Sequence, residues 1–366
     1  MSPVTARIRV LVVEDSLTVR QRLCEVIAGD PELELAGDCS DGQRAIELCR
    51  LHRPDVITMD MMLPGVSGLA ATEHIMAHFP TPILIVSSST NRGELLQTYQ
   101  ALAAGAVDVL EKPRGDEPEG EWEARFLARL KLVSRIRVIT HLRGRLAGHG
   151  SVSQPVPVIA GGPGAADAPH ELIAIGASTG GPAAIVDVLR ALPATVDQPV
   201  LLVLHIGEPF GAAFADWLTG MARRPVVHPA TGTRLASLRG RVAMAPPGRH
   251  LIVRGGAVHL ADGPERHSCR PSIDVLFESI ALACGARTIA ALLTGMGRDG
   301  ASGLLAIRRA GGHTLAQDEA TSVVYGMPRE AALLGAAIDI LPLPQLGPAI
   351  AALAQAGGPR GGEEPR

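Results

Sequence analysis

The chain has few aromatic residues, no excess of basic charge and no long apolar run. Phe, Tyr and Trp make up 2% of its 366 residues, so stacking on bases or sugars is not favoured. The formal net charge is -3 at pH 7, which argues against a nucleic-acid-binding face. No uninterrupted apolar stretch approaches the ~18 residues that a membrane-spanning helix needs. We therefore expect no nucleic-acid partner and no membrane-embedded segment.

Cysteine is also scarce, and the N-terminus carries no secretory pattern. An odd number of cysteines without a CxxC pair predicts reduced, buried thiols, not disulfides or a metal site. The first residues lack the charged lead, apolar middle and cleavage site of a signal peptide. Together these features predict a cytoplasmic protein. The five cysteines are Cys24, Cys39, Cys49, Cys269 and Cys284.

The first part of the chain alternates short apolar runs with amphipathic segments. Five strand-like runs separated by helix-like stretches such as Leu17–Ala28 and Gly42–Leu51 predict a five-stranded parallel sheet, doubly wound with helices on both faces. The apolar runs are Ile8–Val13, Leu33–Ala36, Val56–Met59, Ile83–Val86 and Val107–Leu110.

A helix and a low-complexity segment separate this part from the rest. Residues 119–146 carry acids early, arginines late and apolar residues at helical spacing, which predicts one extended last helix. The domain would then span residues 1–146. Residues 147–169 are rich in Gly, Pro, Ala and Ser and predict a flexible linker. A second domain is expected over 170–356, followed by a polar, disordered tail over 357–366.

The second domain shows another alternation of strands and helices. It predicts a mainly parallel, doubly wound α/β sheet of hydrolase-like type, with a small hairpin inserted at Leu251–Val253 and Val258–Leu260. The expected strands are Leu172–Ile175, Val200–His205, Val242–Met244, Thr288–Thr294, Thr314–Ala316 and Ile338–Leu341, and the expected helices are Pro182–Ala191, Ile273–Cys284, Gly300–Ala310 and Pro328–Leu334.

Polar residues follow the strands of the first domain, where ligands of doubly wound sheets bind. Glu14 and Asp15 follow the first strand, and Asp60 follows the third. Three converging acids repel one another unless a hard cation such as Mg²⁺ joins them. Asp60 can then accept a phosphoryl group, while Lys112 and Ser87, after the fifth and fourth strands, can bind its oxygens. Helix capping would explain Asp15 alone, but not all of these positions together.

The segments LVVEDS, TMDMMLPG, VSSS and LEKP resemble the receiver domain of two-component response regulators over residues 6–114. The resemblance implies phosphotransfer from a histidine kinase to Asp60, with Glu14 and Asp15 helping to bind Mg²⁺. Two positions depart from the common pattern. Val109 stands where many receivers carry an aromatic switch residue, and Met62 stands where a polar residue is common.

A second candidate site lies on the turn Gly176-Ala177-Ser178-Thr179-Gly180. Small residues around Ser178 allow a sharp strand-to-helix turn that exposes the hydroxyl. The N–H groups of the following helix would favour developing negative charge. The same pattern also fits a glycine-rich ligand loop with an incidental serine.

A serine nucleophile needs a base and an orienting acid. His205 ends the next strand at the same sheet edge as Ser178, and Asp299 lies in a glycine-containing loop after a later strand. The backbone N–H of Met296 in that loop could bind an oxyanion. An alternative set in α/β-hydrolase order is Ser178, Asp274 and His313.

Several longer segments, with the receiver in front, resemble a chemotaxis protein-glutamate methylesterase. The resemblance implies Ser178 as nucleophile, His205 as base, Asp299 as orienting acid and the Met296 N–H as oxyanion donor. Leu204 departs from the glutamine that often precedes the histidine. The segments are IAIGASTGGP, APPGRH, RPSIDVLF, LLTGMGRDGASGLLAIRRAGG and TLAQDEATSVVYGMPREA.

By this resemblance, the substrate is a glutamyl methyl ester on the cytoplasmic part of a chemoreceptor, and deamidation of receptor glutamine is a second activity. The ester reaction needs no cofactor, whereas the receiver needs Mg²⁺. We expect phosphorylation by a chemotaxis histidine kinase to relieve a block of Ser178 by the receiver. The alternative is a phosphorylation-dependent, receptor-binding adaptor with an inactive hydrolase fold.

Overall fold

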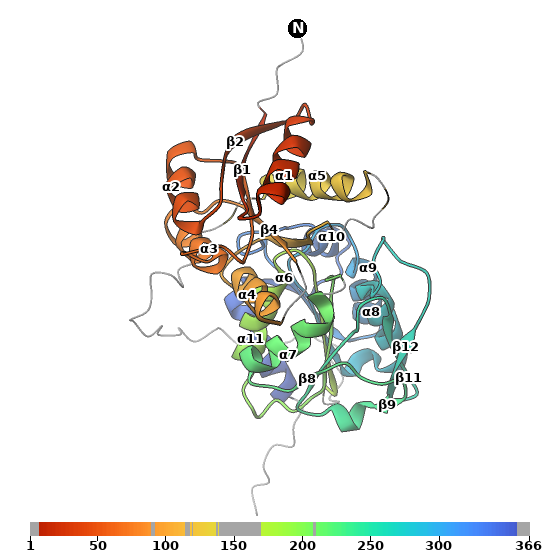
Figure 1. Ribbon diagram of the computed structural model, residues 1–366. Coiled ribbons are helices and arrows are strands. Elements are labelled where there is room, and N and C mark those ends of the chain that lie inside the picture. Colours follow the sequence, from red (N-terminus) through yellow and green to blue (C-terminus); the bar gives the residue numbers. More distant parts are fainter. Residues whose placement is uncertain are drawn as a thin grey trace, which may run out of the picture. The chain divides into compact units, whose positions relative to one another are not determined.

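The computed structural model describes residues 7–88, 92–113, 118, 120–136, 138, 170–207 and 210–356. The chain divides into two compact units, Met1–Ser151 and Val152–Arg366 (Figure 1). The linker predicted over 147–169 and the tail predicted over 357–366 lie outside the described residues.

The first unit contains a five-stranded sheet in the order β2-β1-β3-β4-β5, with all neighbours parallel. Its central strands are mostly apolar, and β3, β4 and the last four residues of β1 are buried, as the sequence predicts for a sheet covered on both faces. The strands are β1 (Ile8–Val13), β2 (Leu33–Cys39), β3 (Val56–Met59), β4 (Ile83–Ser87) and β5 (Asp108–Glu111).

Five described helices cover this sheet. Helices α1 and α5 pack together on one face, and α2, α3 and α4 pack in a row on the other (Figure 1). The predicted doubly wound arrangement is therefore confirmed. The helices are α1 (Leu17–Ala28), α2 (Gly42–His52), α3 (Gly68–His78), α4 (Arg92–Ala103) and α5 (Glu121–Ser134).

Helix α5 is shorter than the continuous helix expected over 119–146. Its apolar stripe, which includes Trp122 and Val133, is buried as predicted. The helix ends at Ser134, where the N–H groups of Arg135 and Ile136 bond to carbonyls three residues back. Ile136, three residues after Val133, is still buried, so the apolar spacing continues past the end of the helix, but β-branched Ile136 and Val138 favour helix less. Residues 139–146 lie outside the described residues.

The second unit contains a seven-stranded sheet in the order β15-β14-β13-β6-β7-β10-β8. All its described neighbours pair in parallel, so the mainly parallel sheet is confirmed. Strand β7 ends one residue before His205, and β13 ends two residues before Thr294. The strands are β6 (Leu172–Ala177), β7 (Val200–Leu204), β8 (Val226–Val227), β10 (Val242–Met244), β13 (Thr288–Leu292), β14 (His313–Gln317) and β15 (Asp339–Leu341).

The predicted hairpin is present and belongs to a small antiparallel sheet. Strands β11 (His250–Arg254) and β12 (Ala257–Ala261) pair with each other, and β9 (Thr233–Arg234) adds a third strand to β12. Helix α8 packs against β11, which joins the hairpin to the main core.

Helices cover both faces of the seven-stranded sheet. Helices α6, α7 and α11 pack in one group, and α8, α9 and α10 in another. Leu276 and Phe277 of α8 and Leu304 of α9 are fully buried against β13. The helices are α6 (Gly181–Ala191), α7 (Phe210–Ala222), α8 (Ile273–Ala283), α9 (Ala301–Arg309), α10 (Met327–Leu333) and α11 (Leu343–Ala356), with short 3-10 turns η2 (Leu235–Leu238) and η3 (Gly285–Arg287).

Both parallel sheets contain a point where the strand order reverses. In the first unit this point lies between β1 and β3, and in the second between β6 and β13. Loops leave such a point in opposite directions, so a crevice forms at the carboxyl ends of the two strands. The candidate residues of each site follow these strands.

Candidate active site and phosphorylation site

Ser178 lies on a tight turn between β6 and α6. Its N–H donates to the Thr294 carbonyl at 3.0 Å, and its own carbonyl accepts from the Gly181 N–H at 2.7 Å. Gly180 precedes α6 with φ +76°, and a Cβ there would approach Val323 at 2.5 Å. Both the backbone angle and the close packing require glycine at this position.

His205 lies next to this turn because β7 is the neighbour of β6. The N–H of His205 donates to the carbonyl of Ala177, directly before Ser178, at 3.1 Å. The His205 side chain turns to Asp299, with Nε2 2.9 Å from Oδ2. The structure therefore brings the predicted base and the predicted acid together.

Asp299 is held by several donors at the start of α8. Its carboxylate accepts from Ser272 Oγ at 2.7 Å, from the Ile273 N–H at 2.7 Å and from the Asp274 N–H at 3.2 Å. Only 2% of the residue is exposed. Burial alone would raise the pKa of Asp299, but the contacts with His205 and these donors lower it. Asp299 is therefore a fixed negative charge beside the imidazole.

The second ring nitrogen of His205 faces a cysteine that sequence reasoning missed. Nδ1 lies 3.6 Å from Sγ of Cys269, whose sulfur also lies 3.3 Å from the His267 carbonyl oxygen. Burial would lower the pKa of His205, but the hydrogen bonds with Asp299 and Cys269 raise it to about 9. Cysteine spacing gave no signal for this contact, since 64 positions separate the two residues.

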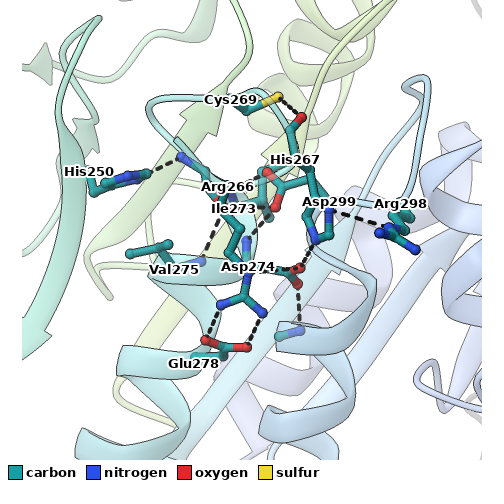
Figure 2. A network of polar contacts seen from close by, with 12 residues as sticks. His250, Arg266, His267, Cys269, Ile273, Asp274, Val275, Glu278, Arg298 and Asp299 are labelled. Atoms are coloured by element: carbon teal, nitrogen blue, oxygen red, sulfur yellow. Dashed lines mark hydrogen bonds and ion pairs between the residues drawn. The ribbon is translucent and has the colours of Figure 1, made fainter. Parts of the chain in front are cut away.

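Cys269 is placed by a tight turn over Arg266–Cys269. The two end residues exchange backbone hydrogen bonds at 3.1 and 2.9 Å. The two central residues, His267 and Ser268, have φ of 52° and 57°. Positive φ at both central positions is typical of a type I′ turn. Figure 2 shows this turn above α8, with Cys269 bonded to the His267 carbonyl.

A second buried acid, Asp274, supports the turn from below (Figure 2). It accepts from the Gly303 N–H at 2.6 Å and lies 3.1 Å from Nε2 of His267. Burial raises the pKa of the Asp274 carboxyl. Arg266 binds Glu278 through two nitrogens, at 2.5 and 2.7 Å, and ties the turn to α8.

The alternative set of Ser178, Asp274 and His313 is not assembled. His313 begins β14, at the sheet edge opposite Ser178, and its Nε2 lies 2.7 Å from Asp339. Asp274 lies instead near Asp299 and bonds with His267. The order of residues along the chain was therefore a poorer guide than their position at the sheet edge.

The loop after β13 lies beside Ser178. A Cβ on Gly295 would approach the Cβ of Ser178 at 2.7 Å, which shows how closely the two backbones pack. Met296 is 53% exposed. Among the described residues, the Met296 N–H donates no hydrogen bond to the protein, whereas that of Gly295 bonds to Val324. The Met296 N–H can therefore serve a ligand oxygen.

The acidic residues of the first unit also converge. Glu14 and Asp60 are 0% and 1% exposed, and Lys112 Nζ lies 2.9 Å from Glu14 and 3.0 Å from Asp60. Burial and the nearby Asp60 raise the pKa of Glu14 to about 7. Burial also raises the pKa of Asp60, although Lys112 opposes that shift. Concentrated negative charge is thus only partly compensated here.

This acidic group fits a divalent cation. One ligand oxygen from each of Glu14, Asp15 and Asp60 lies within 4.8 Å of the others. Oδ1 of Asp60 is buried and has no hydrogen-bond partner among the described residues. Carboxylate oxygens completed by water are the ligands that Mg²⁺ prefers. In the second unit, His205, Cys269 and Asp299 also cluster within 4.8 Å, but the Asp299 oxygens already accept several hydrogen bonds.

Comparison with known proteins finds one family model within each of the two units. Residues 173–350 match the CheB methylesterase family model, and residues 10–118 match the response regulator receiver domain. A protein-glutamate methylesterase/protein-glutamine glutaminase of Anaeromyxobacter dehalogenans is 42% identical over 93% of this chain and 95% of its own length. A protein of the same name from Pseudomonas aeruginosa is 44% identical over 94% of this chain and 96% of its own length.

The chain belongs to the CheB methylesterase family. Its first unit is a response regulator receiver domain. Among solved structures, the catalytic domain of Thermotoga maritima CheB methylesterase is similar, with 30% identity, a TM-score of 0.48 and coverage of 50% of this chain and 98% of that one. Within the part of the chain that the structure describes, no helix is both long and apolar enough to cross a membrane.

The structure shows the burial and packing of the three residues that depart from the family pattern in this CheB-family protein. Leu204 is 1% exposed, and its Cδ1 would lie 2.8 Å from a Cβ on Gly181, so it fills space beside α6. Met62 is 48% exposed, two residues after Asp60. Val109 is half-buried on β5. Ser87, one of the predicted phosphoryl-binding residues, donates to Glu94 Oε1 at 2.7 Å.

Proposed function

We propose that this protein hydrolyses glutamyl methyl esters on chemoreceptors with Ser178, His205 and Asp299, and that phosphorylation of Asp60 activates it. The observation that carries the ester chemistry is the His205–Asp299 bond of 2.9 Å beside the Ser178 turn. The names of the relatives support the substrate class. Signalling of this kind would take place in the cytoplasm, where the receptor's methylated helices and its kinase would meet the enzyme.

In the first half of the reaction, Ser178 Oγ attacks the ester carbonyl carbon. Because Nε2 of His205 bonds to Asp299, Nδ1 is the nitrogen that takes the serine proton, and it gives up its 3.6 Å contact with Cys269 Sγ to do so. The carbonyl electrons move to oxygen, and the Met296 N–H binds the resulting oxyanion. The carbon–oxygen bond to the methoxy group then breaks, and His205 returns the proton to release methanol.

In the second half, water attacks the acyl-enzyme. His205 removes a proton from this water and gives it to Ser178 Oγ as the carbon–oxygen bond to Ser178 breaks, and the released glutamic acid loses its proton to solvent. A glutamine side chain passes through the same tetrahedral intermediate with ammonia as the leaving group. Deamidation therefore needs no further residue, which supports the glutaminase activity named for the relatives.

In the receiver, Asp60 attacks the phosphorus of a histidine kinase's phosphohistidine, and the phosphorus–nitrogen bond breaks. Mg²⁺ held by Glu14, Asp15 and Asp60 would neutralise charge between the carboxylates and the phosphoryl oxygens. Lys112 now bridges Glu14 and Asp60, so it lies within reach of the incoming group. Ser87 can donate its hydroxyl hydrogen to a phosphoryl oxygen.

The test is methanol release from methylated receptor fragments, with and without a small phosphodonor. The wild type should release methanol, faster with the phosphodonor, and Ser178→Ala should release none. Ser237→Ala, an exposed serine of the same unit, is the matched control. Asp60→Asn should keep the basal rate and lose the stimulation.

The adaptor alternative makes a different prediction. If the hydrolase fold only binds receptors, Ser178→Ala should retain the full biological effect and the wild type should release no methanol. The convergence of Ser178, His205 and Asp299 at one sheet edge favours the enzyme.

A further inference from the structure

A buried acid in the receiver takes no part in the cation or phosphoryl chemistry described above. Glu94 lies on α4 and is 2% exposed. Its Oε1 accepts from Ser87 Oγ at 2.7 Å. Ser88 Oγ lies 3.0 Å from Oε1 and 2.8 Å from Oε2. The acid therefore bonds to the last residue of β4, Ser87, which is the predicted phosphoryl ligand, and to Ser88, the residue after it.

A second side chain of α4 touches the same hydroxyl. Thr98, one helical turn after Glu94, has its Oγ1 3.3 Å from Ser87 Oγ. Ser87 and Thr98 are both 0% exposed. Since Ser87 gives its hydrogen to Glu94, Thr98 is the donor in the second bond. Helix α4 thus holds the Ser87 hydroxyl at two points.

The backbone of Ser87 is fixed close to the phosphorylation site. Its carbonyl accepts from the Lys112 N–H at 3.0 Å, and the Lys112 side chain bonds to Asp60. Strand β4, which Ser87 ends, pairs with β3, which directly precedes Asp60. Ser87 is therefore the last residue of a strand that lies beside the strand leading to Asp60, and Lys112 contacts both residues.

A serine hydroxyl has one hydrogen, so it can donate fully to one acceptor at a time. A Ser87 that donates to Glu94 cannot also donate to a phosphoryl oxygen on Asp60. The two acceptors therefore compete. The Glu94 carboxyl group would still have a hydrogen-bond partner after the exchange, because Ser88 Oγ remains in contact with it.

We propose that Glu94 is a positioning residue that holds the Ser87 hydroxyl toward α4 and sets how strongly the receiver responds to phosphorylation. The proposal rests on the phosphorylation of Asp60 proposed above. When the phosphoryl group arrives, Ser87 exchanges Glu94 for a phosphoryl oxygen and gives up both contacts with α4. Helix α4 then has a different set of bonds in the two states. Val109, in register with Ile85 on β4, has no polar atom that could replace them.

The test uses the full chain and beryllium fluoride with Mg²⁺, which mimics a phosphoryl group on the acceptor aspartate. Titration calorimetry gives the half-saturating concentration for wild type, Glu94→Ala and Glu94→Gln. Losing a hydrogen bond to a charged acceptor should favour the bound state by about tenfold. We therefore expect a half-saturating concentration about tenfold lower for Glu94→Ala, with Glu94→Gln in between because its amide oxygen still accepts. Gln100→Ala, an exposed position on the same helix, should match the wild type.

A double variant separates positioning from a general effect on the helix. In a Ser87→Ala background, Glu94→Ala should cause no further change, because the hydroxyl for which the two acceptors compete is gone. An unchanged or higher half-saturating concentration for both Glu94 variants would overturn the proposal, and so would an effect that persists without the Ser87 hydroxyl. Circular dichroism checks folding, and Glu94→Gln tests the same contact if Glu94→Ala does not fold.

The outcome for Asp60→Asn distinguishes this proposal from the one on which it rests. If the wild type binds beryllium fluoride no better than Asp60→Asn does, the phosphorylation site itself is wrong, and the role of Glu94 falls with it. If the wild type binds at Asp60 and the Glu94 variants behave like the wild type, only the role of Glu94 is wrong.

Discussion

Nε2 of His205 lies 2.9 Å from Oδ2 of Asp299, although 94 positions separate the two residues in the chain. The contact forms because β7 and β13 flank β6 in the sheet. Asp299 accepts a hydrogen bond from the Nε2–H group, so the other ring nitrogen, Nδ1, is the base. This one contact decides both the tautomer and the direction in which the imidazole faces.

Asp299→Asn should lower kcat by about 10³-fold or more, because an amide favours the wrong tautomer of His205. It should also lower the free energy of unfolding, since the amide NH₂ would face the donors Ser272 and Ile273. Methanol release and denaturant unfolding measure the two effects. Asp262→Asn, 73% exposed beside Arg249, is the control and should change neither. Full activity in Asp299→Asn would remove this acid from the mechanism.

The pH dependence should reveal the charge state of His205. Its pKa is raised from 6.5 to about 9 in the folded protein, so the stability that it contributes is complete below about pH 6.5 and is lost as pH rises through 9. The base must be unprotonated, so kcat/KM should rise over the same range.

Cys269→Ala should move this rise of kcat/KM to lower pH, because the hydrogen bond with Cys269 helps to raise the pKa of His205. Rate profiles of the wild type, Cys269→Ala and the control Cys284→Ala would show the shift. The same profile in all three proteins would mean that the thiol does not act on the imidazole.

Gly295→Ala should lower kcat by about 10²-fold, because a Cβ would meet both Ser178 Cβ and Met327 at 2.7 Å and push the serine out of position. Overpacking of this kind costs about 1–3 kcal/mol of unfolding free energy. Gly220→Ala, in open space on α7, should stabilise by up to about 1 kcal/mol and leave kcat unchanged. Steady-state kinetics give kcat and unfolding curves give the free energy of unfolding for both variants. A fully active Gly295→Ala protein would contradict the close packing.

Asp60→Asn should make the receiver more stable in a buffer with a chelator, because it removes one of the buried like charges. Glu14 and Asp60 share one Lys112, and relief of their repulsion should add about 1 kcal/mol or more. Thermal unfolding measures the change. Added Mg²⁺ should stabilise the wild type much more than the variant. A variant less stable than the wild type in chelator would show that the Lys112–Asp60 bond outweighs the repulsion.

The sequence predicted the sheets well because their strands are buried on both faces. Runs such as Val10–Val13 and Leu201–Leu204 consist of apolar residues throughout, which parallel strands between two helix layers require. Helix α11 was not predicted, and Pro348 lies inside it. Packing against α6 outweighs that penalty, since Gly347 lets α11 approach so closely that a Cβ would lie 2.5 Å from Ala191. Such tertiary compensation leaves no local pattern.

The sequence placed together those residues of the candidate site that directly follow strands. Ser178 and His205 directly follow neighbouring strands, so the sheet edge brings them together without further information. The contacts of Cys269 with His205 and of Ser272 with Asp299 depend on a turn and a helix start far away in the chain. These contacts form only when that turn and the start of α8 pack against the carboxyl end of the sheet. The hydrogen bond between Glu94 and Ser87 was not predicted for a different reason. Acidic residues on helices are usually exposed, and nothing in the sequence around Glu94 indicates that it is buried.

The division into two units has an evolutionary consequence. All groups proposed for phosphoryl transfer lie between Glu14 and Lys112, and all those proposed for ester hydrolysis lie between Ser178 and Asp299. A recombination joint anywhere in residues 139–169 would separate no reactive group from its partners. Gene fusion could therefore place the same esterase under another sensor, or the same receiver in front of another enzyme, without rebuilding either reaction centre.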